Sequence, residues 1–427
     1  MASERLSPDQ KGQASITMGD VIRRTRNNFP EARFRPQIYK ETTNYTIAGI
    51  DPSPYRFWVT ADGIGTKPEL AERLLDETSD PSHFEGLAFD TFAMIDGDEA
   101  RFGRFLVGIA EVLDANSAID QRVIAALAKG AEEACNKGRF AFLNGETAEL
   151  GYRTSGYGNT RVNWNAVGIS IVNEEKLILG DGLQPGQLVV AFREPSIRSN
   201  GLSKARTIIE TAYLQGLHFD SKQEMVAHFL RTRGMRGSNQ EIENELRNLF
   251  GHDALEQVLI PWHKKFPDVT KQLLKPSILY DPIIYDAQGG VEGERKVNMI
   301  AAAHISGGGV PEKGKRMVES KKLGLAVNAI FPDPDGVQSL LAIAEKLPQE
   351  IRQKIGINDR IACEQWNRGI GFMVVVPNQE EAKKLIDIAG QHECEAGIAG
   401  EVIDQPELQF KGYKWRYSNH IGIPDKR

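Results

Sequence analysis

Four short stretches of this sequence combine glycine with acidic or hydroxyl side chains. They are DGIGTK at residues 62–67, DGDE at 96–99, NGETAE at 144–149 and SNG at 199–201. Magnesium is usually held by a few carboxylates together with phosphate oxygens and water. Glycine allows a backbone to approach a ligand closely, since it carries no side chain. Together, these residue types favour a magnesium-dependent polyphosphate site that is divided among several loops.

A fifth stretch, HISGGG at residues 304–309, contains three consecutive glycines. Ordering glycine costs conformational entropy, and a run of glycines can therefore remain a flexible turn. Alternatively, it can be an ordered backbone that lies close to a ligand, because glycine has no side chain. Bare N–H groups in such a loop can face phosphate, especially where the loop opens a helix. The stretch by itself leaves both interpretations open.

Each of the first four stretches also has an interpretation without a ligand. Residues 62–67 could be a tight turn with a solvated lysine, and 96–99 could be a solvated acidic helix end. Residues 144–149 could cap a helix, as 199–201 could. A P-loop, a G-x-S-x-G nucleophile turn and a dinucleotide G-x-G-x-x-G motif are all lacking.

Composition narrows the protein class. The chain has 427 residues, of which 41% are hydrophobic and 26% charged, as in ordinary globular proteins. Its formal net charge of -6 argues against a general nucleic-acid binder. The three cysteines are isolated, and the polar start and short apolar runs predict neither a signal peptide nor a membrane helix. We expect a cytoplasmic protein with no membrane or nucleic-acid partner.

Strand-like and helix-like segments alternate along the chain, which predicts an α/β or α+β fold. Apolar, β-prone runs predict strands at 56–60, 104–112, 140–143, 164–172, 188–192, 278–280, 369–377 and 396–403. Apolar residues at helical spacing predict helices at 83–95, 119–137 and 379–389. The glycine-rich loop at 180–186 predicts a boundary between domains at 1–178 and 183–427, and a charged helical insert is expected at about 216–265.

The order of the motifs resembles a known family. DGIGTK, NGETAE, SNG, HISGGG, NRGIGFMVVV and GEV run collinearly from Trp58 to Asp404, as in the phosphoribosylformylglycinamidine cyclo-ligases, or aminoimidazole ribonucleotide (AIR) synthetases. The resemblance implies two α/β domains of the AIR-synthetase type. It further implies that the N-terminal domains of two subunits pair into a barrel-like core with the site near the interface. We therefore expect a homodimer.

The resemblance also implies a set of site residues. It assigns magnesium to Asp62, Asp98 and Glu146, and ATP to these residues together with Gly63, Gly65, Thr66, Lys67, Gly145 and Thr147. It assigns the small-molecule substrate, a phosphorylated ribonucleotide, to Arg198, Ser199, Asn200, Ser306, Gly307 and Gly308. Catalytic roles fall on Lys67, Asp98 and His304.

The reaction that the family implies is an ATP-dependent ring closure in purine biosynthesis. ATP phosphorylates the amide oxygen of a formylated amidine, and an internal nitrogen then attacks that carbon and displaces phosphate. Phosphoryl transfer mainly requires charge neutralisation and alignment. Carboxylates that hold magnesium, a lysine and glycine-rich amides fit that requirement.

The chain departs from the family pattern at several positions. A G-G-F-G-G segment is missing from residues 1–57, Arg198 stands in place of a histidine, Gly97 in place of an asparagine, and Ile278 in place of an arginine. One alternative is therefore a relative that uses Mg-ATP to activate a different acceptor. Another is a non-catalytic nucleotide-binding paralogue, against which the retained carboxylates argue.

Overall fold

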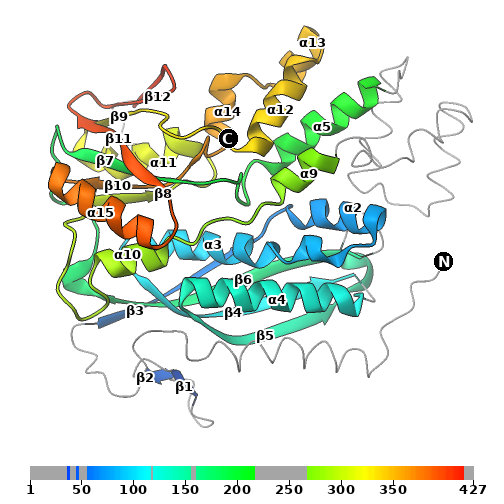
Figure 1. Cartoon of the computed structure of the whole chain (residues 1–427), viewed down its shortest axis with the longest axis horizontal. Coiled ribbons are helices and arrows are strands. Elements are labelled where there is room, and N and C mark those ends of the chain that lie inside the picture. Colours follow the sequence, from blue (N-terminus) through cyan, green and yellow to red (C-terminus); the bar gives the residue numbers. More distant parts are fainter. Residues whose placement is uncertain are drawn as a thin grey trace, which may run out of the picture.

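The computed structural model describes residues 36–38, 45–47, 55–116, 119–154, 160–216 and 267–417. Two sheets with their covering helices lie one above the other (Figure 1). A two-stranded ribbon of β1 (Pro36–Ile38) and β2 (Tyr45–Ile47) precedes them. The helical insert expected at about 216–265 lies outside the described residues, except for its first residue. Within the described ranges, no helix is long and apolar enough to cross a membrane.

The first sheet has four strands in the order β3 (Tyr55–Gly63), β6 (Val162–Asn173), β4 (Phe105–Ala115) and β5 (Ala141–Glu149). Only the β4–β5 pair is parallel. Along β6, buried Trp164 and Ala166 alternate with the more open Asn165 and Val167. Because successive side chains of a strand point to opposite faces, one face of this curved sheet is covered and the other is open.

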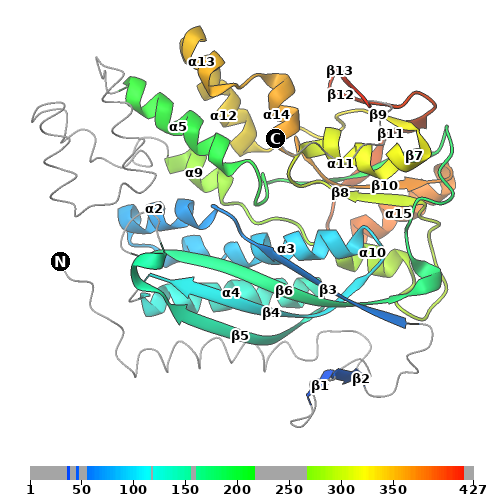
Figure 2. The same ribbon diagram turned by 180° about the vertical axis from the view of Figure 1, so that it is seen from behind.

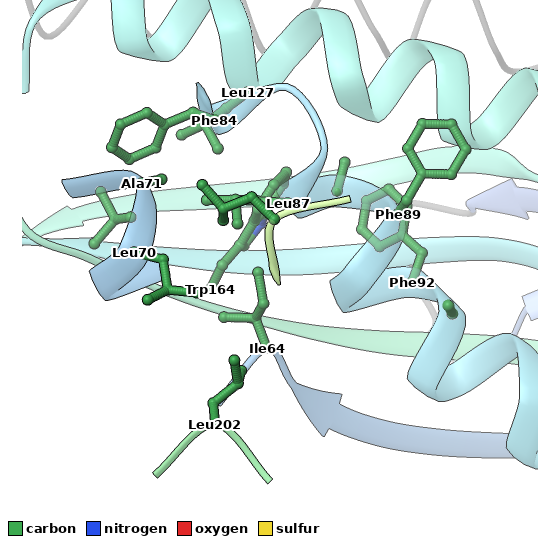
Figure 3. Packing of buried hydrophobic residues seen from close by; sticks show 14 of the residues in the cluster. Ile64, Leu70, Ala71, Phe84, Leu87, Phe89, Phe92, Leu127, Trp164 and Leu202 are labelled. Carbon is green, nitrogen blue, oxygen red and sulfur yellow. The ribbon is translucent and has the colours of Figure 1, made fainter. Parts of the chain in front are cut away.

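The covered face of the sheet, which carries Trp164 and Ala166, is packed against three helices (Figures 1 and 2). They are α2 (Pro68–Thr78), α3 (Leu87–Ala100) and α4 (Gln121–Gly138). The apolar residues of helix α3 are spread around the helix and not confined to one face, and every residue of it except Asp98 is buried. A helix of that kind must be enclosed by other elements, and α3 contacts the sheet, α4 and α10 (Asp281–Ala287). Figure 3 shows Phe92 of α3 against Trp164, at a ring-centroid distance of 5.7 Å.

The second sheet has seven strands in the order β13-β12-β9-β11-β7-β10-β8. All neighbouring pairs are antiparallel except β12 with β9. The strands are β7 (Leu188–Arg193), β8 (Ala301–His304), β9 (Gly324–Val327), β10 (Ile370–Val376), β11 (Ala396–Ile403), β12 (Glu407–Phe410) and β13 (Tyr413–Arg416). Every residue of β10 is buried, because helices cover both faces of the sheet.

The helices of this half fall into three groups. Helices α10 and α15 (Gln379–Gln391) pack on one face, and α11 (Gly309–Val318) and α14 (Asp359–Gln365) pack on the other. A third group lies beside the sheet and reaches the core of the first half through Leu202, Leu273 and Leu340. It comprises α5 (Leu202–Gly216), α9 (Pro267–Leu273), α12 (Asp335–Glu345) and α13 (Gln349–Ile355).

The predicted mixed α/β class is confirmed, but two local predictions are wrong. Residues 278–280 form no strand, because the Asp96 carboxylate accepts hydrogen bonds from Tyr280 N at 2.6 Å and Asp281 N at 3.1 Å and so starts helix α10. Residues 144–149 do not cap a helix; they continue strand β5. The two domain boundaries remain predictions.

Candidate functional site

Three of the glycine-containing loops meet beside the second half of helix α3. A Cβ atom added at Gly65 would lie 3.3 Å from the carbonyl oxygen of Ser199. A Cβ atom added at Gly307 would lie 3.2 Å from Oδ1 of Asn200. The hydroxyl of Ser199 also donates to the carbonyl of Asp90 in α3, at 3.1 Å. The structure thus brings 62–67, 199–201 and 304–309 together, as a loop-divided site requires.

Two carboxylates face this junction from different elements. Asp62 is the last residue but one of strand β3, and its Oδ1 accepts a hydrogen bond from Gly63 N at 2.7 Å. Asp98 lies in the last turn of α3 and is 37% exposed. Burial raises the pKa of Asp62; the Gly63 N–H lowers it, and the negative charge of Asp98 raises it further. Two carboxylates that repel each other favour a bound cation, and the place where Asp62, Asp98 and the three loops meet is called the cleft below.

His304 connects Asp98 to the glycine loop. Its Nδ1 lies 3.1 Å from Asp98 Oδ1, and since a carboxylate only accepts, Nδ1 carries the proton. Its Nε2 is buried and has no hydrogen-bond partner within the described residues. Burial, together with the positive charge of Arg198, lowers the pKa of His304 to about 4. The imidazole is therefore neutral near pH 7, with a free lone pair on Nε2.

Lys67 occupies a different position from the one expected. It is fully buried, and its ammonium lies 2.7 Å from Asp90 Oδ1, 3.2 Å from Ser196 Oγ and 3.1 Å from the carbonyl oxygen of Lys275. It is neither a solvated turn lysine nor open to a phosphate. These contacts satisfy its three donors and join α3 to the chain before α10. In this structure, the assignment of Lys67 to ATP and to catalysis has no geometric support.

The side chain of Arg198 is also buried and does not face the cleft. Its Nη1 lies 2.6 Å from Glu194 Oε2 and its Nη2 lies 2.7 Å from the carbonyl oxygen of Ala93, with 1% of the residue exposed. The guanidinium therefore neutralises a buried glutamate. It offers no open contact to an anionic substrate in this structure, and its assignment to the substrate stays a prediction.

Glu146, the third proposed magnesium ligand, lies apart from the other two. Asp62, Ala166, Glu111 and Gly145 form one row across the sheet, and Glu146 belongs to the next row. Adjacent rows point to opposite faces. Strands β3 and β5 are also the two edges of the sheet, about 14 Å apart at the usual strand spacing. Within one chain, Glu146 does not join Asp62.

The remaining predicted residues divide between the loops and the strands. Gly65 and Thr66 are exposed at the turn after β3, while Thr147 is half-buried in β5. The Ser306 carbonyl accepts from Gly309 N at 3.0 Å. Gly308 has φ +89° and precedes α11, and a Cβ atom at Gly309 would lie 2.0 Å from the Cys363 carbonyl oxygen. The triple glycine is thus an ordered, tightly packed helix entry.

Glu111 is a buried carboxyl that sequence reasoning missed. Its Oε2 accepts from Trp164 Nε1 at 2.7 Å, and its Oε1 has no partner in the described part of the chain. A Cβ atom at Gly145 would lie 2.3 Å from that Oε1, so this glycine makes room for Glu111. Burial raises the pKa of Glu111 to about 8. The available signal was a single glutamate in the apolar run at 104–112.

Among the described residues, no group of three or more histidine, cysteine, aspartate or glutamate side chains is placed to hold a metal. Asp62 and Asp98 fit an ion that takes few protein ligands and completes its shell with phosphate oxygens and water. They do not form a closed protein cage.

Comparison with known proteins supports the resemblance. Residues 264–412 match the family model "AIR synthase related protein, C-terminal domain". A phosphoribosylformylglycinamidine cyclo-ligase of Methanococcus maripaludis is 25% identical over 364 residues, or 85% of this chain and 82% of that protein. One of Prochlorococcus marinus is 24% identical over 343 residues, or 80% and 78%. This chain is thus similar to the AIR synthases over most of its length.

The fold of this chain also occurs in a solved structure. A thiamine-monophosphate kinase from Stenotrophomonas maltophilia superposes with a TM-score of 0.52 at 13% identity, covering 92% of this chain and 96% of that one. At this identity the likeness concerns the fold alone. The family resemblance drawn from the ordered motifs is confirmed by the sequence comparisons.

Proposed function

We propose that this chain is an ATP-dependent ligase that closes an imidazole ring in purine biosynthesis by way of a phosphorylated amide. The observation that carries the proposal is the meeting of Asp62, Asp98 and His304 beside the ordered loop 304–309. Two cleft carboxylates, a neutral imidazole and a glycine-rich helix entry suit a reaction that needs charge neutralisation and alignment. The names of the relatives support the same reaction class.

Each residue contributes a definite chemical property to that reaction. Asp62 and Asp98 are the residues that would hold Mg2+, and ATP, when bound, supplies the phosphoryl group that turns the amide oxygen into a leaving group. The Nε2 lone pair of His304 can accept a hydrogen bond from an N–H group of the acceptor. Asp98 fixes the proton on Nδ1 and so keeps Nε2 in the accepting form.

The open face of the four-stranded sheet supports pairing with a second copy. Val59, Val112 and Val167 are 63%, 42% and 38% exposed on the face opposite helices α2, α3 and α4. A contiguous apolar surface of this kind marks an interaction site in most soluble proteins. Glu146 lies on the same open face, so a homodimer built on it would place Glu146 of each copy towards the other.

A second candidate function is activation of a different acceptor by the same nucleotide site. The observation that favours it is the burial of Arg198, which stands where the cyclo-ligases have a histidine. The acceptor side of the cleft therefore differs from the family pattern, whereas Asp62 and Asp98 are kept. A non-catalytic paralogue is less favoured, because repelling cleft carboxylates without a ligand would cost stability.

The deciding experiment measures ADP release from Mg-ATP with and without formylglycinamidine ribonucleotide. The cyclo-ligase proposal expects stimulated ADP release together with an imidazole product. ATP binding without stimulation would favour the different acceptor. Asp62→Asn is the matched variant: it should abolish magnesium-dependent ATP binding while the protein stays folded, and unchanged ATP affinity would refute the site.

A further inference from the structure

One buried aromatic residue touches two of the loops that meet at the cleft. Trp366 follows helix α14, and its Nε1 donates a hydrogen bond to the carbonyl oxygen of Gly201 at 3.2 Å. A Cβ atom at Gly201 would lie 2.5 Å from the same Nε1. At the other loop, a Cβ atom at Gly309 would lie 2.9 Å from the carbonyl oxygen of Trp366. Two loops that are distant in sequence therefore rest against one residue.

Both contact points are glycines at the entry to a helix. Gly201 has φ +75° and Gly309 has φ +61°, so a side chain at either position would be strained and would also collide with its neighbours. Gly201 precedes α5, and its carbonyl also accepts from the Ala205 amide at 3.1 Å. Gly309 is the first residue of α11. Trp366 thus contacts the points at which both loops continue into their helices.

The segment that carries Trp366 is held in place by a buried guanidinium. Nε and Nη2 of Arg368 donate to the Asp333 carboxylate at 2.9 and 2.7 Å. The other N–H groups donate to the carbonyl and carboxylate oxygens of Asp359, at the start of α14, and to Cys363 Sγ. All five donors of the arginine are used. These bonds offset the cost of its left-handed backbone, which has φ +52°.

We propose that Trp366 is a positioning residue, which holds the loops at 199–201 and 304–309 in the relative arrangement that the acceptor requires. The inference rests on the proposed function, because it takes the ligand of these loops to be the acceptor of that reaction. The loops meet where Gly307 faces Oδ1 of Asn200, and Trp366 fixes the chain within two residues of each. Ligand affinity depends on such preorganisation of the binding groups.

The first test measures the order of the loops and needs no turnover. Trp366→Phe keeps a buried ring but removes the N–H that binds Gly201. Hydrogen exchange at the Ala205 and Gly309 amides should therefore become about threefold to tenfold faster, the effect of losing one hydrogen bond. Amides of β10 should keep their wild-type exchange, which separates local opening from a global loss of stability.

Trp415→Phe is the matched control for this test. It also removes an indole hydrogen bond to the region of α14, because Trp415 Nε1 donates to Glu364 of that helix at 2.7 Å. Its partner is not a loop of the cleft, so exchange at Ala205 and Gly309 should match the wild type. Equal exchange of these two amides in Trp366→Phe and the wild type would overturn the proposal, whatever reaction the protein catalyses.

The second test asks whether the order of the loops serves the acceptor. The KM for formylglycinamidine ribonucleotide should rise about tenfold in Trp366→Phe, while kcat and Mg-ATP affinity change by less than about twofold. Trp415→Phe should keep the wild-type KM. An unchanged KM in a Trp366→Phe protein whose loops exchange faster would overturn the role towards the acceptor. A wild-type protein that the ribonucleotide does not stimulate would instead count against the proposed function, and the exchange result would still decide whether Trp366 orders the loops.

Discussion

The His304 ring packs directly on Gly97, so that a Cβ atom at position 97 would lie 2.6 Å from both Cγ and Cδ2 of the imidazole. The same ring reaches Asp98 through Nδ1 at 3.1 Å. Two successive residues of α3 thus fix the position of the ring. Gly97 leaves the room that the ring occupies, and Asp98 forms a hydrogen bond with it. Gly97 is one of the positions at which this chain departs from the cyclo-ligase pattern.

We predict that Gly97→Ala displaces His304 and destabilises the protein by about 1–3 kcal/mol, the usual cost of overpacking. Chemical denaturation would measure the loss, and ADP release would fall in parallel. Gly390→Ala is the control, since no atom lies within 4 Å of its added Cβ in helix α15. That substitution should stabilise by up to about 1 kcal/mol, the helix-propensity difference. A Gly97→Ala protein of wild-type stability would contradict the packing.

The buried Lys67–Asp90 pair makes a second prediction. Lys67→Met leaves a carboxylate buried without its cation, so we expect a loss of about 3–5 kcal/mol in unfolding free energy even without ligand. The double variant Lys67→Met/Asp90→Leu should recover much of that loss. Lys129→Met removes an exposed partner of Glu85 and should change stability by at most about 1 kcal/mol.

A different result would support the assignment of Lys67 to the ligand site. If Lys67→Met unfolds at the same denaturant concentration as the wild type but loses ATP binding, the lysine binds the nucleotide. The Lys67–Asp90 ion pair then contributes little to the stability of the fold. Equilibrium unfolding and nucleotide titration on the same preparation separate the two roles.

Local sequence pattern predicted the strands well where propensity and tertiary packing agree. Strand β11 was predicted at 396–403 and has these bounds. The motifs at 62–67, 199–201 and 304–309 lie together, whereas 144–149, which the resemblance groups with them, lies apart. The success at β11 depends on information within one short segment.

The failures share one physical cause, which is a partner distant in sequence. Asn, Gly and Glu are poor strand formers, yet 144–149 extends β5 because it pairs in parallel with β4. Residues 278–280 are β-prone, but Asp96, more than 180 residues earlier, accepts hydrogen bonds from the N–H groups of Tyr280 and Asp281. The buried position of Lys67 likewise depends on its ion pair with Asp90, and no local sequence motif indicates that pairing.

Glu111 gives a prediction about pH. Its folded-state pKa of about 8 lies above the ordinary value of 4.5, so the folded protein holds a proton that the unfolded chain has lost. The contribution of Glu111 to the free energy of unfolding is therefore greatest below about pH 4.5 and is lost as the pH rises to about 8. Glu111→Gln keeps an acceptor for Trp164 Nε1 and does not titrate. Its stability relative to the wild type should rise by a few kcal/mol at most between pH 5 and pH 9.

The comparison is made by denaturation at both pH values. Glu133→Gln is the control, because Glu133 is half-exposed on α4. That substitution should change stability by less than about 0.5 kcal/mol at either pH. A constant difference between Glu111→Gln and the wild type across the range would show that Glu111 does not hold an extra proton.

The open sheet face gives the last prediction. Val59→Asp places a charge within the exposed apolar surface, on strand β3, so we expect a dimer in the wild type and a monomer in the variant, measured by sedimentation. Leu179→Asp is the control, because Leu179 is 58% exposed but lies outside the sheet. Circular dichroism checks that both variants fold. If Val59→Asp remains a dimer, the face is not the interface.

The position of Glu146 allows the same interface to be tested by activity. Within one chain Glu146 and Asp62 lie on opposite edges and faces of the sheet, so the two can act together only if different copies supply them. Asp62→Asn and Glu146→Gln should each be inactive alone. When they are mixed and allowed to exchange subunits, about a quarter of the sites should combine both intact residues and regain ADP release. Lack of recovery in a mixture shown to contain heterodimers would mean that Glu146 serves no site across the interface.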